Sequence, residues 1–373
     1  MPAFAIFRLP YKENCQVMIQ DGGEPEEMLS VAALSGKDGF AVAPFAVDSK
    51  HPVLLLHPDR CLDILPDDLV QKDEENGCTT VLKAILDAPK QEESKRSGTR
   101  THYTVDFANF HAHIMEGDFS KIVLARCRCD KNERGMKPLE MFAEACKMYP
   151  RMFVALVSAY RCGTWLMATP EVLLEGDGKR WASMSLAGTM PLTGEMLEFD
   201  NPPSPHPQHA DNILWNIKNI QEQRFVSTFI TESLEQVATD IEEDGPYTMR
   251  AGNLVHLRSD FHFTMPHHDN IGRLLAILYP TPAVCGLPKE AARDFIVNNE
   301  YAPRQYYSGF VGPLNPNGET HLYVSLRCMR IGQGECYLFA GGGLLADSDQ
   351  EAEWRETEDK METMGVLLHN SDM

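Results

Sequence analysis

The 373-residue sequence has no long uninterrupted apolar segment, no Cys-x-x-Cys pair and no excess of positive charge. None of its apolar runs approaches the roughly 20 residues that a membrane-spanning helix needs. The first residues, MPAFAIFRLPYKEN, lack a basic segment followed by an apolar core, so we expect no signal peptide and a cytoplasmic protein. With 34 basic and 54 acidic residues, the net charge of −20 would repel nucleic acid and acidic membranes, so neither is expected as a partner.

The cysteines and histidines form no recognisable disulfide or metal-binding pattern. Ten cysteines are scattered, mostly inside apolar segments, and the single Cys-x-Cys would place Cys127 and Cys129 on the same face of a strand. This is typical of reduced, buried cysteines. No Ser-His-Asp or His-rich constellation stands out, which disfavours a hydrolase. Four histidines in loop-like segments are interpreted as loop residues and not as metal ligands: His206, His209, His267 and His268.

Composition and length are those of an ordinary globular protein, with 43% apolar and 24% charged residues. We expect a single large domain over residues 1–373. Residues 1 to about 85 contain short apolar runs separated by turn signals, which predict strands and a helix near 79–86. The polar segment 87–100 is predicted to be a surface loop that closes a less specific N-terminal portion, residues 1–100.

Beyond this loop the periodic signals become clearer. Helical spacing is found at 105–118 and 138–149, and a β-branched apolar run typical of a buried strand at 119–129. Residues 152–189 are predicted to form successive strands with short connections, which favours antiparallel pairing. Many strands followed by helices packed on them indicate an α+β fold and not a doubly wound one.

A long helix is predicted from about 211 to 240. At 100° per residue, Glu222 falls within its apolar stripe, where a charge is costly unless it is paired or bound to a metal. Two further strands are predicted at 321–329 and 335–341. In the first, Arg327 is expected on the polar face.

The C-terminal segment from Tyr337 to Met361 is predicted to form a strand, three consecutive glycines and a helix. Ser348 with Glu351 three residues later resembles a capping box, so the helix is expected to begin at Ser348. Glycines without a Cβ let another group approach the backbone closely. Because the following helix is rich in glutamate, the segment is better suited to a cation that holds an anion than to a phosphate loop.

Eight sequence motifs together resemble the chorismate-utilising enzymes, and most closely an isochorismate synthase related to anthranilate synthase component one. In chain order they are FSKIVLAR, TPEVLL, LAGT, the Lys218-to-Glu222 helix, YPTPAVCGLP, RQYYSGFVG, LRC and AGGGLLADSDQEAEWRETEDK. The resemblance covers roughly residues 103–368 and implies a chorismate-binding catalytic region at 101–368. It also implies two stacked, mainly antiparallel sheets surrounded by helices, and a Mg²⁺-dependent reaction.

The resemblance assigns the catalytic pair. Lys121 of FSKIVLAR would be the base that activates water, and Glu171 of TPEVLL the acid that protonates the departing hydroxyl. Both lie in apolar surroundings, which favour neutral lysine, with a useful pKa of about 7 to 8 instead of about 10.4, and a protonated glutamic acid. The alternative is a buried Lys–Glu ion pair without a catalytic role.

The resemblance places Mg²⁺ on Glu222 and Glu356, with Glu353 as a nearby carboxylate. Oxygen ligands, retained waters and only one or two carboxylates suit this ion. The ion would bind the ring carboxylate of chorismate. Alternatively, Glu356 could simply form an i,i+4 pair with Lys360, worth about 0.3–0.5 kcal/mol.

The second carboxylate of chorismate needs its own partners, and the resemblance supplies candidates. Arg327 can bind a carboxylate bidentately, and Tyr307 can add one hydrogen bond. The remaining expected substrate-binding residues are Ala187, Gly188 and Thr189 of the A-G-T motif, Thr281 and Ala283 of PTPAV, Gly309, the three glycines Gly341, Gly342 and Gly343, and Lys360. For Thr281 and Ala283, a purely structural tight loop is an equally good interpretation.

Two positions separate the branches of the family. Alanine at Ala187, where some relatives have a covalent lysine, disfavours an aminodeoxychorismate-type route, and Lys121 points to water instead of ammonia. The expected product is isochorismate, for menaquinone or siderophore biosynthesis. A salicylate synthase, which also eliminates pyruvate, and a non-catalytic relative remain alternatives, and a monomer is the default expectation. Four residues depart from the family pattern: Leu192, Gln223, Tyr279 and Cys285.

Overall fold

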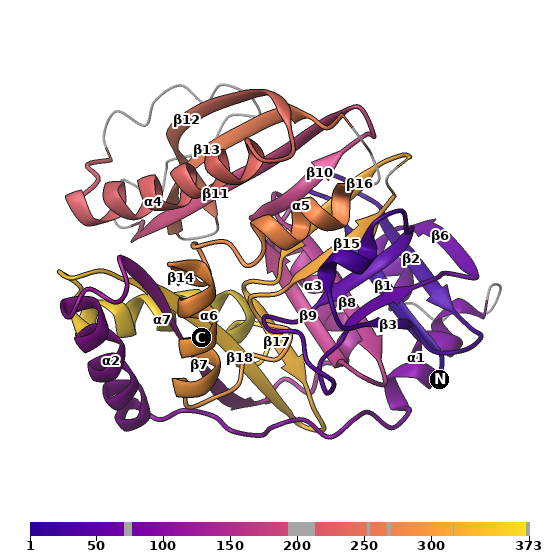
Figure 1. The fold of residues 1–373 in the computed structure, drawn as a ribbon. Coiled ribbons are helices and arrows are strands. Elements are labelled where there is room, and N and C mark those ends of the chain that lie inside the picture. The colour runs from indigo at the N-terminus through magenta and orange to yellow at the C-terminus, as the bar shows by residue number, and fades with distance from the viewer. Residues whose placement is uncertain (71–76, 193–212, 252–253, 267–269, 316, 371–373) are drawn as a thin grey trace.

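Two antiparallel sheets of nine strands each organise the chain in the computed structural model (Figure 1). The structure describes residues 1–70, 77–192, 213–251, 254–266, 270–315 and 317–370, so His206, His209, His267 and His268 lie outside the described residues. The first sheet runs in the order β14 (Gly286–Leu287), β7 (Lys121–Lys131), β18 (Glu335–Leu344), β17 (Cys328–Ile331), β9 (Gly163–Thr169), β8 (Phe153–Ala159), β1 (Ala3–Arg8), β2 (Cys15–Gln20) and β6 (Arg60–Ile64).

The second sheet has the same number of strands and carries the longest hairpin. Its order is β12 (Thr239–Ala251), β13 (Leu254–Thr264), β11 (Arg180–Pro191), β10 (Val172–Gly176), β16 (Thr320–Val324), β15 (Phe310–Leu314), β4 (Gly39–Ala43), β5 (Val53–Leu56) and β3 (Glu26–Met28). The described pairings are antiparallel, which agrees with the short connections seen in the sequence.

Helices cover the outer faces of both sheets. They are α1 (Cys78–Asp87), α2 (Arg100–Met115), α3 (Pro138–Met148), α4 (Ile217–Leu234), α5 (Ile271–Leu278), α6 (Lys289–Asn299) and α7 (Gln350–Gly365), with short 3₁₀ turns at Val31–Leu34 and Pro66–Leu69. One apolar core lies between the sheets, and separate cores lie under α1, α3 and α7 on the first sheet and under α4 and α5 on the second. The predicted α+β architecture of two stacked sheets with surrounding helices is confirmed.

The N-terminal portion completes both sheets. Strands β1, β2 and β6 extend the first sheet beside β8, and β3, β4 and β5 extend the second beside β15. The segment after α1 has neither helix nor strand, but it is tied down because the Gln91 amide donates to the Tyr160 carbonyl and the Gly98 amide to the Cys127 carbonyl.

The three consecutive glycines are part of a strand, so the strand predicted at 335–341 is longer than expected. β18 continues through them to Leu344, and Gly341, Gly342 and Gly343 pair with Ala125, Leu124 and Val123 of β7. Their backbone groups are therefore engaged in the sheet. Because these residues have no side chains, other groups can approach the faces of the sheet closely.

The predicted strand 321–329 is wrong as a single element. It divides into β16, in the second sheet, and β17, in the first, so the chain changes sheets between Val324 and Cys328. Arg327 lies in this crossing with φ 44°, a left-handed conformation that is uncommon for a residue with a side chain. It is therefore not on the polar face of a strand.

Two helix boundaries also differ from the sequence prediction. α4 is shorter than the predicted 211–240, because the Asn216 side chain accepts from the Asn219 amide and starts the helix, and the chain enters β12 at Thr239. In α7 the cap is Asp349, whose side chain accepts from the Ala352 amide, and not Ser348. A carboxylate at this position also favours the positive end of the helix dipole.

Candidate active site

A cleft of about 620 Å³, including open solvent at its mouth, lies where the two sheets and the loop before β14 meet. Eleven of the predicted site residues line it: Glu171, Ala187, Gly188, Thr189, Glu222, Ala283, Tyr307, Arg327, Gly341, Gly343 and Lys360. They come from segments that are up to 190 residues apart in the sequence, so only the fold brings them together. The mixture of apolar walls with a few charged groups suits a small anionic molecule.

Lys121, at the start of β7, is completely buried behind the wall formed by Glu222 and Gly343. Its Nζ lies 3.0 Å from Glu222 Oε1, the buried carboxylate of α4. Burial would raise the pKa of Glu222, but the positive charges of Lys121 and Lys218 outweigh it and lower that pKa. The ion pair weighed for Lys121 therefore exists, with Glu222 as the partner.

Glu171 lies in the short connection between β9 and β10 and is 2% exposed. Its backbone is held on both sides, since its amide donates to Thr169 Oγ1 and its carbonyl accepts from the Val324 amide. Burial raises the pKa of the carboxyl to about 8 against the opposing charge of Lys121. At neutral pH this residue holds a proton that it can donate into the cleft.

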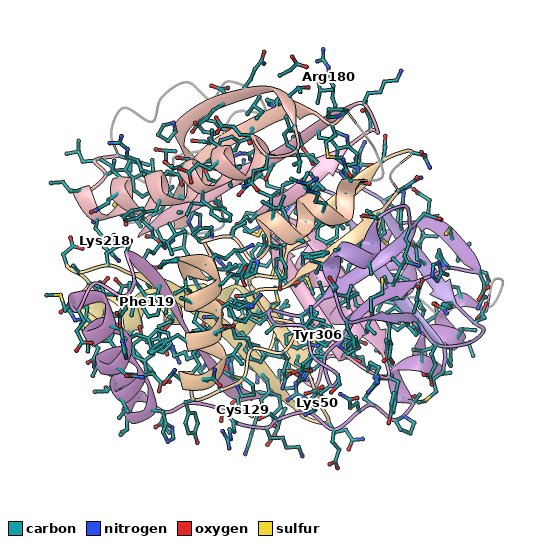
Figure 2. The ribbon with its side chains drawn as sticks, in the orientation of Figure 1. Lys50, Phe119, Cys129, Arg180, Lys218 and Tyr306 are labelled. Atoms are coloured by element: carbon teal, nitrogen blue, oxygen red, sulfur yellow. The ribbon has the colours of Figure 1, made fainter. Side chains whose placement is uncertain are left out.

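Three glutamates meet near the end of β18, and each is paired with a lysine. Lys121 holds Glu222, Lys218 of α4 contacts Glu353 Oε1, and Lys360 Nζ lies 2.6 Å from Glu356 Oε1 within α7. Lys218, labelled in Figure 2, lies near the start of α4. Its ion pair with Glu353 links α4 to α7.

One carboxylate oxygen of this cluster is buried and has no hydrogen-bond partner among the described residues. Glu353 is 2% exposed, and its second oxygen, Oε2, is buried without a hydrogen bond. Burial, with the nearby charge of Glu356, raises the pKa of Glu353 to about 7.

The glycines of β18 create the space for these carboxylates. A Cβ on Gly343 would lie 2.1 Å from Glu222 Oε1, and a Cβ on Gly342 would lie 2.9 Å from Glu353 Oε2. Helices α4 and α7 can therefore press their carboxylates onto the strand. An all-oxygen cluster with an unpaired buried oxygen fits Mg²⁺, and Glu222, Glu353 and Glu356 are the residues that would hold it.

Among the described residues, these three carboxylates do not place ligand atoms within 4.8 Å of one another, and one oxygen of each contacts a lysine. In the described part of the chain, the group with three ligand atoms within 4.8 Å of one another is His113, Glu116 and Asp118. That group lies at the end of α2, away from the residues that line the cleft, and two of its members are exposed. A solvated surface cluster of this kind needs no ion.

Arg327 is a buried cation facing the cleft without an ion-pair partner among the described residues. It is 6% exposed, and burial lowers its pKa to about 10. Its Nη2 donates to His256 Nε2 at 2.9 Å, and its Nη1 to Thr363 Oγ1 at 3.2 Å. Both partners are neutral, so the positive charge is left for a ligand.

His256 of β13 is a cleft residue that sequence analysis missed. Its Nδ1 lies 3.1 Å from the Gly188 carbonyl, which can only accept, and its Nε2 receives the bond from Arg327. The two contacts require the neutral form protonated at Nδ1. Burial, then the charges of Arg327 and Lys360, hold the pKa of His256 well below its usual range. A lone histidine in a strand pattern carried no signal for this role.

The other predicted site residues lie outside the cleft wall. Gly309 packs on β4, where an added Cβ would lie 1.8 Å from the Ala43 carbonyl oxygen. Thr281 lies in a tight turn in which its carbonyl accepts from the Val284 and Cys285 amides, as the structural interpretation of this loop proposed. Its hydroxyl is buried without a partner.

The sequence matches the chorismate binding enzyme family over residues 54–369. The chain belongs to this family. Among curated relatives, it is 31% identical over 204 residues to the isochorismate synthase EntC of Escherichia coli, covering 54% of this chain and 50% of that protein. It is 31% identical over 258 residues to the salicylate biosynthesis isochorismate synthase of Pseudomonas aeruginosa, covering 68% and 52%. The chain thus spans about half the length of these relatives.

Solved structures show the same fold at lower identity. The 2,3-dihydroxybenzoate-specific isochorismate synthase DhbC of Bacillus anthracis aligns with a TM-score of 0.77 and 19% identity, over 98% of this chain and 96% of that one. Anthranilate synthase component I of Streptococcus pneumoniae aligns with a TM-score of 0.65 and 16% identity, over 98% and 90%. These likenesses establish the chorismate-binding fold.

The four departures from the family pattern are all buried and do not line the cleft. Leu192 packs with Ile213 and Val255. The Tyr279 hydroxyl donates to the Pro44 carbonyl. Cys285 places its carbonyl 2.7 Å from the Val123 amide beside β7, and Gln223 bonds two buried serines under α4.

Proposed function

We propose that this protein is a Mg²⁺-dependent isochorismate synthase that converts chorismate to isochorismate. The observation that carries the proposal is the placement of two buried side chains: Glu171 lines the cleft with a carboxyl whose pKa burial raises to about 8, and Lys121 lies behind the cleft wall beside Glu222. The side chain of Ala187 at the cleft wall has no amine, so this position cannot form a covalent intermediate. The two curated relatives named above are isochorismate synthases by name.

In the proposed reaction, Lys121 removes a proton from water as the water oxygen bonds to one ring carbon. Glu171 donates its proton to the hydroxyl that leaves another ring carbon, so that water departs. The bond formed and the bond broken are both C–O bonds, and substrate and product are isomers. The step leaves Lys121 protonated and Glu171 ionised. Loss of the lysine proton and reprotonation of the carboxyl restore the starting state.

The two carboxylates of chorismate would bind to two different sources of positive charge. Arg327 carries an unpaired buried charge suited to the enolpyruvyl carboxylate, and the Tyr307 hydroxyl can add a hydrogen bond. Mg²⁺ held by Glu222, Glu353 and Glu356 would supply the positive charge for the ring carboxylate. A net charge of −20 makes both local sources of positive charge necessary.

The test is a product assay with purified protein, chorismate and Mg²⁺, resolved by chromatography. We expect isochorismate to accumulate to equilibrium with chorismate. Salicylate and pyruvate would identify the salicylate synthase alternative. Absence of any product, with the metal bound, would refute the enzyme assignment.

A matched pair of variants tests the role of the lysine. Lys121→Ala removes the proposed base and should lower kcat by about 10²- to 10⁴-fold. Lys131→Ala, at the exposed end of the same strand, should leave kcat unchanged. Equal kcat of the two variants would refute the role of Lys121 as the base.

A further inference from the structure

The fully buried side chains in the first half of α4 are all polar. Before Val226 the buried residues of this helix are Asn219, Glu222 and Gln223. Ile217 and Ile220 of the same half are exposed, by 82% and 44%, and Phe225 is half-buried. This half carries Lys218 and Glu222, so its placement determines where two charged groups of the cleft lie.

Gln223 provides the hydrogen bonds that join this half of α4 to the second sheet. Its Nε2 lies 2.6 Å from Ser185 Oγ and 3.4 Å from Ser259 Oγ. Ser185 and Ser259 are completely buried and face each other in the β11–β13 pairing. One amide therefore bridges two neighbouring strands from the helix above them.

A second contact brings the helix close to the sheet one turn earlier. Gly188 is the residue at the irregularity between Ala187 and Thr189 in β11, and it has φ +70°. A Cβ there would lie 3.0 Å from the Asn219 Cβ. This contact sets the distance between helix and sheet, but a non-directional contact leaves rotation about the helix axis unspecified.

Rotation of α4 matters because Glu222 and Gln223 are adjacent and point about 100° apart. While Gln223 is bonded to the sheet, Glu222 is directed at Lys121 and at Gly343, where its Oε1 would lie only 2.1 Å from an added Cβ. A rotation of about 10° moves an atom about 6 Å from the axis by about 1 Å. That displacement would move the Glu222 carboxylate out of its close contacts with Lys121 and Gly343.

We propose that Gln223 is a positioning residue that fixes the rotation of α4 and thereby places the Glu222 carboxylate for the metal. The metal in this inference rests on the proposed function, whereas the placement of Glu222 by Gln223 rests on geometry alone. Stability by itself does not call for glutamine here, because its Oε1 is buried without a partner in the described part of the chain, and an apolar side chain of similar size would leave no such atom unpaired.

The experiment compares Gln223→Leu with Gln221→Leu, a control at an exposed position of the same helix. Backbone hydrogen exchange should become faster over residues 217–224 in Gln223→Leu and stay unchanged over 226–234, which Val226 and Ile230 anchor. The calorimetric Mg²⁺ dissociation constant of the full chain should rise by about tenfold or more. Gln223→His, which keeps a ring N–H donor, should recover most of the affinity, and the control should match the wild type.

Two results would overturn the inference: exchange and Mg²⁺ affinity in Gln223→Leu equal to those of the control, or faster exchange along all of α4. If Gln223→Leu does not fold, Ser185→Ala removes the 2.6 Å bond from the other side and is judged by the same criteria. Failure of the proposed function is distinguishable. In that case the wild type forms no isochorismate, while the local exchange difference between the two glutamine variants persists.

Discussion

Replacing Gly343 with alanine probes the site through a single methyl group. The Cβ would lie 2.1 Å from Glu222 Oε1 and 2.8 Å from Lys121 Cε. To restore an ordinary contact of 3.4 Å, the carboxylate must move by about 1.3 Å. Gly343 does not have a left-handed backbone, and it pairs with Val123, so the strand itself accepts alanine.

The displacement acts on the two groups that the mechanism needs. A misplacement of about 1 Å at a reacting site can cost about 100-fold, so kcat/KM for chorismate should fall by about that factor. The thermal midpoint should change little, because alanine replaces glycine within a strand. The measurement is steady-state kinetics with a thermal melt of each variant. Gly22→Ala is the matched control, since a Cβ there meets nothing within 4 Å.

A double-mutant cycle separates steric displacement from other effects of the methyl group. In a Glu222→Ala background the clashing carboxylate is gone, so Gly343→Ala should add much less than its full penalty. Wild-type kinetics in Gly343→Ala, or an undiminished penalty in the Glu222→Ala background, would contradict the packing described for Gly343.

Three further predictions follow from single contacts. Because the pKa of Glu171 is about 8, the protonated acid is present below that pH and is lost above it; a pH profile of kcat should fall as pH rises through about 8, and a pH-independent rate would contradict the assignment. Arg327→Met should raise KM for chorismate by about 10- to 100-fold while the fold persists, since a charge-assisted hydrogen bond is lost; an unchanged KM would place the carboxylate elsewhere. Asp349→Ala should destabilise the protein by about 1 kcal/mol in chemical unfolding without changing KM, as expected for a helix cap, and no loss of stability would argue against that cap.

Much of the cleft was predicted from sequence because its residues lie in motifs that resemble those of a known family. Glu171 sits between apolar residues, which already suggested a raised pKa, and the structure buries it to 2% exposure. Lys121 begins an apolar strand and is completely buried. The pairing of Lys121 with Glu222 was not predictable, because no local pattern links a strand to a helix 100 residues later.

Local signals were misleading where the tertiary structure imposed another conformation. Periodicity predicted a single strand over 321–329. The chain instead leaves one sheet and enters the other at Arg327, whose backbone is left-handed. The strand predicted at 335–341 was too short, because β7 supplies a pairing partner that also keeps Gly342 and Gly343 extended. His256 had no sequence signal at all, because its role depends on Arg327 and Gly188 meeting it across the sheet.

The sequence by itself determined the alternation of strands and helices, the apolar surroundings of Lys121 and Glu171, and the acid-rich helix near the C-terminus. These properties depend on side-chain chemistry within a few residues, which periodicity and composition report directly. Only the tertiary structure decided which lysine pairs with which glutamate, that Arg327 is left without an ion-pair partner among the described residues, and that glycines of β18 seat the carboxylates. Those contacts join distant segments, so they exist only once two sheets and their helices have packed together.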